Sequence, residues 1–251
     1  MEKMPWKLMP GNDTNVRFGE MEVEMIKKGC GGTDLTIVNA ARVSFNKESE
    51  ELQPKDEKLI KYLAEHNHWT PFGHGTLQFR IKAPIFVARQ LVKHQVGLVW
   101  NEVSRRYVDD DPDFFMPEVW RANPDNVKQG SSETETISEL GFFGPLTGQM
   151  YTTVPIEKHI IAIYEQSLDL YKSMIRTGVC AEQARMVLPA AIFTEWYWTG
   201  SLYAFARVCN LRCAKDTQKE TRYIANRISE EAQKRFPVSW KYLKGEDTND
   251  T

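Results

Sequence analysis

Polar and ionisable side chains are concentrated in one stretch of the chain, residues 82–110, where they lie between apolar residues. The stretch contains Arg89, Gln90, Lys93, His94, Gln95, Asn101, Glu102, Ser104, Arg105, Arg106 and Tyr107. A structural helix would place its charges on one solvated face, whereas these cations, amides and hydroxyls are mixed with apolar positions. The pattern therefore indicates a cleft for an anionic ligand that also forms hydrogen bonds.

Two arginines outside this stretch stand in apolar surroundings. Arg185 lies in the run ARMVLP, and Arg212 follows a long apolar run. A guanidinium among aliphatic side chains requires a carboxylate, a phosphate or a polar base edge as its partner. For one such arginine a salt bridge in the core is a sufficient explanation. However, Arg106 beside Ser104 and Tyr107 adds a third cation, and the three together favour a bound phosphomonoester.

Histidines form a second group of candidates. His66, His68 and His74 lie around the run WTPFG. Zinc is compatible with this spacing in principle, but no cysteine lies nearby and no Glu stands at a helical offset. We therefore prefer one functional histidine with structural neighbours, and we predict no metal site. His94 is either a residue of a helix surface or a contact to a cofactor.

Several familiar catalytic arrangements are missing from the sequence. The run GCGG at 29–32 lacks the spacing of a dinucleotide-binding loop, and Ser104 is not part of a nucleophile elbow. Cys209 and Cys213 are expected on one helix face, where buried thiols are favoured over a functional pair. No metal-binding spacing and no pair poised for thiolate attack is found among Cys30, Cys180, Cys209 and Cys213.

The composition is that of a soluble globular enzyme. Of the 251 residues, 41% are hydrophobic and 26% are charged. A formal net charge of -2 argues against a general polyanion binder, so we expect no nucleic-acid partner. The first residues lack the apolar run of a signal peptide, and no run approaches the ~18 apolar residues of a membrane span. We expect a cytoplasmic protein with reduced thiols and no membrane partner.

Apolar periodicity predicts strands early in the chain and helices late. The strands are expected over 17–28 and 76–83. The helices are expected over 34–41, 55–66, 84–96, 156–177, 181–188, 192–211 and 215–236. Within the second helix, the inward positions are expected to be Leu59, Ile60, Tyr62 and Leu63. The order of elements predicts an α+β fold, with a small antiparallel or mixed sheet and a helical bundle.

The predicted organisation is a single domain over 17–245. An irregular arm over 1–16 precedes it, and a flexible tail over 246–251 follows it. The segment 108–155 is rich in turn-forming residues and predicts a lid, a binding loop or a contact with a partner. The nearly all-apolar helix at 192–211 is expected to be buried, either centrally or at a subunit interface.

Five runs of sequence carry a resemblance to a known family: HNHWTPFGH, KAPIFVARQ, NEVSRRY, ARMVLP and NLR. In this order and with similar spacing, over residues 20–240, they resemble the flavin-dependent thymidylate synthases. The resemblance implies an α+β domain that assembles as a homotetramer, with each active site built from several subunits. It also implies FAD, NADPH and 5,10-methylenetetrahydrofolate as cofactors in the conversion of dUMP to dTMP, with no enzyme cysteine attacking the base.

The resemblance also suggests a role for individual residues. It places Arg212 at the pyrimidine edge, where a cation stabilises enolate-like charge, and His68 near flavin and folate. The implied catalytic residues are Ser104, Arg212 and His68. The implied nucleotide-binding residues are Gln90, Glu102, Ser104, Arg106, Arg185 and Arg212. The implied flavin-binding residues are His68, Lys93, His94, Gln95, Asn101, Glu102, Ser201, Tyr203 and Arg207.

The sequence departs from the family mainly on the flavin side. The family signature is Arg-His-Arg followed by seven residues and Ser, whereas this chain has Lys93-His94-Gln95 and a longer spacing to Ser104. The lysine loses the bidentate fork of an arginine, and the glutamine loses a charge. Further along, Ser201-Leu202-Tyr203 replaces the usual Asn-x-Arg, and Arg207 stands where an Asn is common.

Three functions remain compatible with these departures. The first is a divergent thymidylate synthase that holds FAD through altered contacts, with replacement charge from Arg207 or Lys93. The second is a pyrimidine-nucleotide C5 hydroxymethylase that uses flavin weakly or not at all. The third is a non-catalytic binder of nucleotide or RNA. The substrate base also stays open between dUMP and dCMP, because Arg212 suits either ring edge.

Overall fold

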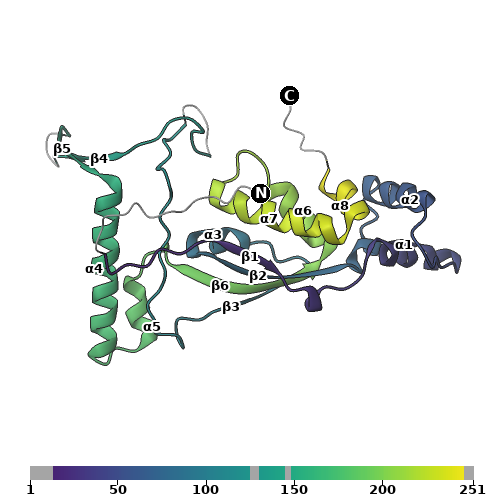
Figure 1. Ribbon diagram of the computed structural model, residues 1–251, viewed down its shortest axis with the longest axis horizontal. Coiled ribbons are helices and arrows are strands. Elements are labelled where there is room, and N and C mark those ends of the chain that lie inside the picture. Colours follow the sequence, from purple (N-terminus) through teal and green to yellow (C-terminus); the bar gives the residue numbers. More distant parts are fainter. Residues whose placement is uncertain (1–13, 125–129, 145–147, 246–251) are drawn as a thin grey trace. The chain divides into compact units, whose positions relative to one another are not determined.

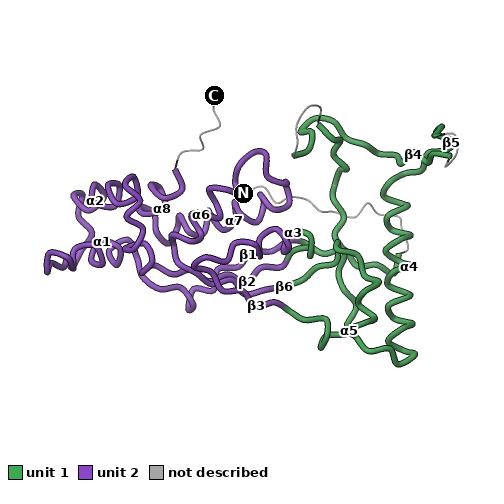
Figure 2. Tube along the Cα trace, turned by 180° about the vertical axis from the view of Figure 1, so that it is seen from behind, with its two compact units in different colours: residues 1–20, 83–86, 103–194 green, residues 21–82, 87–102, 195–251 purple. Residues whose placement is uncertain are grey.

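The computed structural model describes residues 14–124, 130–144 and 148–245 (Figure 1). These residues belong to two compact units (Figure 2). Unit 1 consists of Met1–Glu20, Ala83–Phe86 and Val103–Thr194, and unit 2 consists of Met21–Lys82, Val87–Glu102 and Glu195–Thr251. Most of the predicted arm and all of the predicted tail lie outside the described residues. The single domain over 17–245 stays a prediction.

A four-stranded sheet with the order β1-β2-β6-β3 organises unit 2. Its strands are β1 (Glu22–Met25), β2 (Thr76–Pro84), β3 (Leu98–Glu102) and β6 (Phe193–Ser201). β1 pairs with β2 and β3 pairs with β6, both antiparallel. In β2 the alternate residues Leu77, Phe79 and Ile81 are fully buried. This period of two places one face of the strand on the core, as the sequence predicts.

Two helices cover one face of this sheet, α6 (Leu202–Arg212) and α7 (Lys219–Arg235) (Figure 1). The ring of Phe205 on α6 packs edge-on against Phe79 of β2, at 5.2 Å between ring centroids, and against Trp198 of β6, at 5.3 Å. Edge-to-face aromatic pairs of this kind add to the stabilisation from apolar burial. They fix α6, which ends at Arg212, firmly on the sheet.

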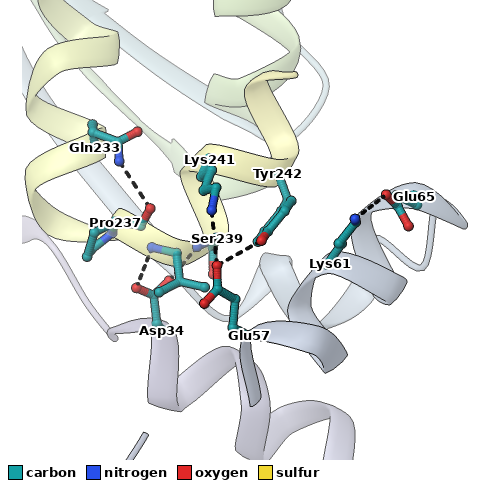
Figure 3. Close-up of polar contacts among 10 residues, drawn as sticks. Asp34, Glu57, Lys61, Glu65, Gln233, Pro237, Ser239, Lys241 and Tyr242 are labelled. Atoms are coloured by element: carbon teal, nitrogen blue, oxygen red, sulfur yellow. Dashed lines mark hydrogen bonds and ion pairs between the residues drawn. The ribbon is translucent and has the colours of Figure 1, made fainter. Parts of the chain in front are cut away.

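Polar contacts join three further helices of unit 2 (Figure 3). These helices are α1 (Asp34–Arg42), α2 (Pro54–Glu65) and α8 (Pro237–Lys244). The buried carboxylate of Asp34 accepts hydrogen bonds of 2.9 and 2.8 Å from two backbone N–H groups in the first turn of α8. Glu57 accepts from Lys241 at 3.1 Å and from the Tyr242 hydroxyl at 2.8 Å. α8 is thus tied to both N-terminal helices.

Unit 1 is built around α4 (Ile156–Arg176), with the short α5 (Ala181–Ala184) and a hairpin of β4 (Glu139–Phe143) and β5 (Met150–Pro155). Its hydrophobic core consists of Val16, Phe114, Tyr164, Leu168, Tyr171, Ala184 and Ile192. The chain also contains α3 (Ile85–Leu91) and the short 3-10 helices η1 (Lys27–Gly29), η2 (Val43–Phe45), η3 (Thr70–Gly73) and η4 (Arg185–Val187).

The predicted α+β class is confirmed, and so are the helices at 34–41, 55–66 and 156–177. The helix predicted over 192–211 is wrong, because its first half is strand β6 and only its second half is helix α6. The first half is rich in aromatic and β-branched residues, which favour strands. The Ser201 side chain accepts a hydrogen bond from the N–H of Ala204 at 3.2 Å and starts the helix there.

Four smaller predictions also need correction. The helix expected over 84–96 is shorter. Pro84 is the last residue of β2, the helix α3 follows it over Ile85–Leu91, and a turn after α3 leads into β3. The loop expected over 108–155 contains the β4–β5 hairpin. The helix expected over 215–236 ends at Arg235, and the further helix α8 begins at Pro237, a residue suited to a first helical turn. Tyr62, expected to point inward, is 50% exposed.

Candidate functional site

In unit 2, the end of α6 and the turn after α3 place a histidine against an arginine. Nε of Arg212 donates a hydrogen bond to Nε2 of His94, at 3.0 Å between the two nitrogens. Both side chains belong to residues that are partly buried. The apolar context of Arg212 in the sequence predicts a polar partner for its guanidinium. In the structure this partner is the neutral imidazole of His94 and not a carboxylate. Among the residues that the structure describes, the remaining N–H groups of the guanidinium have no acceptor and stay available for a ligand.

The surroundings of His94 favour its uncharged form. Burial first, and then the positive charges of Arg212 and Arg207, lower the pKa of His94 below its ordinary value. Both arginines lie on α6, one near its middle and one at its end. Their charge and the neutral ring leave a local excess of positive charge, which suits an anionic ligand.

Gln90, on α3, is held by the start of α7. Its Nε2 donates to Oε1 of Gln218, and its Oε1 accepts from the Thr221 hydroxyl at 3.1 Å. Thr221 is fully buried, whereas Gln90 is partly exposed. These two partners fix the orientation of the Gln90 amide. Neither Gln218 nor Thr221 is predictable from the sequence, because each acts through a contact with a residue more than a hundred positions away.

Strand β3 presents further predicted residues on the exposed edge of the sheet. Asn101 and Glu102 are both exposed, and Trp100 donates from Nε1 to Glu102 at 3.0 Å. Trp100 also stacks on Trp196 of β6, at 4.4 Å between ring centroids. The aromatic stack and the indole hydrogen bond orient the Glu102 carboxylate. The predicted flavin contacts Lys93 and Gln95, on the turn that precedes β3, are exposed as well.

Aromatic residues gather where α6 begins and η3 approaches it. Tyr203 lies 6.0 Å from Trp69, between ring centroids, and the Trp69 ring is 54% exposed. His68, the residue before this tryptophan, is exposed and packs edge-on against Tyr62 at 5.8 Å. Exposed aromatic rings next to a cationic helix can accommodate a planar cofactor.

The hydroxyl of Ser201 already has a structural role. As described above, it caps the N-terminus of α6, so only part of its hydrogen-bonding capacity remains for a cofactor. Among the predicted flavin-binding residues, Ser201 is therefore the one with a sufficient structural explanation.

Unit 1 carries the other predicted nucleotide-binding residues. The Ser104 hydroxyl oxygen accepts from Nε of Arg106 at 3.2 Å and from its backbone N–H at 3.3 Å. The Arg106 guanidinium lies 5.0 Å from the centre of the Tyr107 ring. In contrast, Arg105 is bound to the backbone carbonyl of Asp110 at 2.7 Å. The turn thus uses one arginine for its own structure and leaves Arg106 exposed.

Arg185, also in unit 1, is exposed on η4, with Nε donating to the carbonyl of Glu182 at 3.3 Å. The expectation that this arginine is embedded among apolar side chains is wrong for the single chain. Its neighbour Met186 is 79% exposed. The apolar run around Arg185 is therefore only partly a core segment. No acceptor within the described ranges meets the terminal N–H groups of the guanidinium, which leaves them open to a ligand.

The structure brings several of the predicted residues together within each unit. Gln90, His94, Arg207 and Arg212 lie in unit 2 with their partners from α6 and α7. Ser104 and Arg106 form one turn of unit 1. The assignment of these side chains to a nucleotide or a flavin stays a prediction.

Cys209 is not suited to act as a thiol nucleophile. Its side chain is completely buried, and burial raises the pKa of the Cys209 thiol well above its ordinary value. The thiol therefore stays protonated near neutral pH, as the predicted structural role requires. Within the described part of the chain, no cluster of three or more His, Cys, Asp or Glu side chains is arranged to hold a metal ion. No helix among the described residues is both long enough and apolar enough to cross a membrane.

Comparison with known proteins identifies similar sequences. The family described as "Thymidylate synthase complementing protein" matches residues 27–238. A flavin-dependent thymidylate synthase of Kosmotoga olearia is 34% identical over 227 residues, which cover 88% of this chain and 92% of that protein. One from Thermus thermophilus is 34% identical over 209 residues, covering 83% of this chain and 71% of that protein.

Solved structures of similar fold are known as well. They include the UMP/dUMP methylase PolB of Streptomyces cacaoi, bound with 5-Br UMP or with 5-Br dUMP. The two structures superpose on this chain with TM-scores of 0.70 and 0.72, at 24% sequence identity. The match covers 91% of this chain and 96% of the methylase chain in both cases. At this identity the likeness establishes the fold.

Proposed function

The chain belongs to the flavin-dependent thymidylate synthase family, and on that premise we propose that it converts dUMP to dTMP. In this proposal the added carbon comes from 5,10-methylenetetrahydrofolate, and NADPH supplies the reducing equivalents. The observation that carries the proposal is the partly buried Arg212. His94 accepts a hydrogen bond from Nε of this arginine, and the terminal N–H groups of the guanidinium have no acceptor among the described residues. Such a cation is suited to an oxygen on which negative charge develops during the reaction.

The chain's own residues would bind and orient the nucleotide. Ser104, Arg106 and Arg185 provide a hydroxyl and two exposed guanidinium groups, which is the chemistry that recognises a phosphomonoester and a sugar. The Gln90 amide is already fixed by α7 before the nucleotide binds, and the Glu102 carboxylate is already oriented by Trp100. Preorganised groups lower the entropic cost of holding the substrate in a reactive geometry.

Arg212 would act on the base itself. In the enolate-like form that makes C5 nucleophilic, negative charge is shared with the ring oxygen and nitrogen atoms, and the attack on the folate methylene then places that electron pair in the new C–C bond. A guanidinium held in place beforehand stabilises that charge without reorganising during the step. His68 is exposed beside Trp69 and would contact the folate or flavin rings.

A flavin fits the chemistry of the residues around α6. The exposed Trp69 and the partly buried Tyr203 offer aromatic surface, and Lys93 and Arg207 offer positive charge for a pyrophosphate. When bound, FAD would supply the hydride that completes the methyl group. Contacts from His94, Gln95, Asn101 and Glu102 would orient it.

The affinity for FAD is expected to be weak. Lys93 provides a single point charge where the family has a bidentate arginine, and Gln95 provides none. Ser201 is already engaged as the cap of α6. We expect FAD to be lost when the purified protein is dialysed, which an absorbance spectrum before and after dialysis checks. Stoichiometric FAD that survives dialysis would count against weak binding.

The altered triplet also keeps a second function open, that of a C5 hydroxymethylase. Without hydride delivery, the transferred carbon would be trapped by water as a hydroxymethyl group. Product analysis separates the two activities: incubation with dUMP, methylenetetrahydrofolate, FAD and NADPH gives dTMP in one case and hydroxymethyl-dUMP in the other. A non-catalytic nucleotide binder would bind dUMP and form neither product. The same incubation with dCMP tests the alternative base.

We also propose that the protein is a homotetramer with shared active sites. Several large apolar residues are exposed in the single chain, among them Phe45 at 75% and Met186 at 79%. Surface of this kind marks protein interfaces when it is contiguous. Light scattering coupled to size-exclusion chromatography measures the assembly directly, and a monomer at working concentration would contradict the proposal.

A further inference from the structure

The contact between His94 and Arg212 defines the protonation state of the histidine. A guanidinium carries only donors, so the ring nitrogen that receives Nε–H of Arg212 must offer a lone pair. That nitrogen is Nε2, and a neutral imidazole then carries its proton on Nδ1. The contact therefore exists only while His94 is uncharged and in this one tautomer.

The charges around the ring oppose its protonation. The two charged groups that act on it, Arg207 and Arg212, both belong to α6 and both are positive. Lys93, the preceding residue on its own segment, is a third cation, with an exposed side chain. A proton on Nε2 would remove the acceptor from Arg212 and place a further positive charge beside it. Burial and these arginines lower the pKa of His94, which keeps the ring neutral near neutral pH.

We propose that His94 is a positioning residue that acts through Arg212 on the nucleotide, and that its protonation releases Arg212. In the neutral state the ring anchors Nε of the guanidinium, so that the terminal amino groups face the base. In the charged state this hydrogen bond is broken and like charges separate the two side chains. The inference rests on the proposed function, because it takes the nucleotide as the ligand of Arg212.

This role predicts a specific dependence of dUMP affinity on pH. Because the pKa of His94 is lowered, the contact with Arg212 is complete at and above neutral pH and is lost as the pH falls through that lowered value. The phosphate of dUMP also takes up a proton in a similar range, with a pKa of about 6. A comparison of variants separates the two effects, since the phosphate titrates identically for every variant.

The experiment measures dUMP binding by equilibrium dialysis with the full-length protein in saturating FAD, from about pH 8 to about pH 5.5. His94→Gln keeps an acceptor at a similar distance from the backbone but does not titrate, whereas His94→Phe keeps a ring and loses the acceptor. His74→Gln, at an exposed histidine of the same unit, is the matched control. Thermal unfolding of each variant checks that it is folded.

At about pH 8 we expect His94→Gln to bind dUMP within about threefold of the unchanged protein and His94→Phe about tenfold more weakly. On acidification the unchanged protein and His74→Gln should lose up to about tenfold more affinity than His94→Gln. Superimposable pH curves for all folded variants would overturn the inference, and so would undiminished binding by His94→Phe.

A second readout does not depend on the nucleotide. Long-range proton–nitrogen NMR spectra report the tautomer of each histidine ring, and His94→Gln identifies the signal of His94. We expect a proton on Nδ1 and none on Nε2 at neutral pH. A proton on Nε2 would overturn the positioning role. If instead the tautomer is as expected but no protein binds dUMP at any pH, the proposed function fails, and the link between His94 and the nucleotide fails with it.

Discussion

At the scale of single residues, the arginines differ in how their side chains are already used. Arg105 is bound to the backbone of its own turn, whereas Arg106 and Arg185 are exposed with terminal N–H groups to spare. Arg212 is held by a neutral histidine. To bind a phosphate or a base edge, a guanidinium needs terminal N–H groups without a partner and a backbone that is held in place. Sequence context alone does not separate these cases.

Arg185 provides the most direct prediction at this scale. We expect Arg185→Ala to weaken dUMP binding by over about tenfold, because a charge-assisted hydrogen bond to the phosphate is lost. Titration calorimetry with dUMP measures the effect. Arg176→Ala, at another exposed arginine of unit 1, is the control and should leave the affinity unchanged. Equal affinity of Arg185→Ala and the unchanged protein would contradict the phosphate assignment.

The Gln90 amide leads to a second prediction. Thr221→Val removes the hydroxyl that donates to Oε1 of Gln90 and keeps the shape of the buried side chain. We expect KM for dUMP to rise about threefold to tenfold, since the amide loses one of the two hydrogen bonds that fix its orientation, while kcat changes less. Steady-state kinetics check this. A change in kcat alone would contradict a role in nucleotide binding.

At the scale of elements, periodicity predicts the long amphipathic helices and the strand β2 correctly. It fails at 192–211, where a mostly apolar stretch contains both a strand and a helix. The strand half has no regular alternation of apolar and polar residues, so only the aromatic and β-branched content and the capping Ser201 signal the boundary. Likewise, β3 is short and pairs with β6, which is distant in sequence, so no local sequence pattern predicts it.

The candidate site shows the same division. Residue types and the family resemblance predict that Gln90, His94 and Arg212 belong to a ligand site, and this assignment stays a prediction. They did not predict that Gln218 and Thr221 fix Gln90, or that His94 accepts from Arg212. Those contacts depend on where α6 and α7 lie on the sheet, which is a tertiary property. They therefore emerge only from the structure.

The attachment of α8 gives a stability prediction at this scale. Asp34 is 5% exposed, and its carboxylate satisfies two backbone N–H groups of the first turn of α8. We expect Asp34→Ala to lower the free energy of unfolding by about 1–3 kcal/mol, because two buried donors lose their acceptor. Urea denaturation measures the change. Glu65→Ala, which removes an exposed ion pair with Lys61 of 3.6 Å, should cost under about 0.5 kcal/mol. Equal effects of the two changes would contradict the capping role.

At the scale of the whole molecule, the candidate nucleotide residues belong to two compact units of the chain. Gln90 and Arg212 lie in unit 2, and Ser104, Arg106 and Arg185 lie in unit 1. In the proposed homotetramer with shared sites, these two sets can come from different subunits. Each active site would then depend on two copies of the chain.

Mixing two impaired variants tests this arrangement. We expect Arg212→Ala to be inactive, and Arg185→Ala to have little activity when dUMP is kept well below the concentration that its weakened affinity requires. After the two are unfolded and refolded together, some assemblies contain sites with neither substitution, and part of the activity should return. Refolding each variant alone is the control. No recovered activity in mixed assemblies, verified by differently tagged chains, would contradict sites shared between subunits.

The central claim is that this protein makes dTMP from dUMP with a folate-derived carbon and flavin-dependent reduction. Mass analysis of the product tests it most directly, using dUMP, FAD, NADPH and methylenetetrahydrofolate whose transferred carbon is isotopically labelled. We expect labelled dTMP to form only when FAD and NADPH are both present. Labelled hydroxymethyl-dUMP, or no labelled nucleotide from folded protein that binds dUMP, would contradict it.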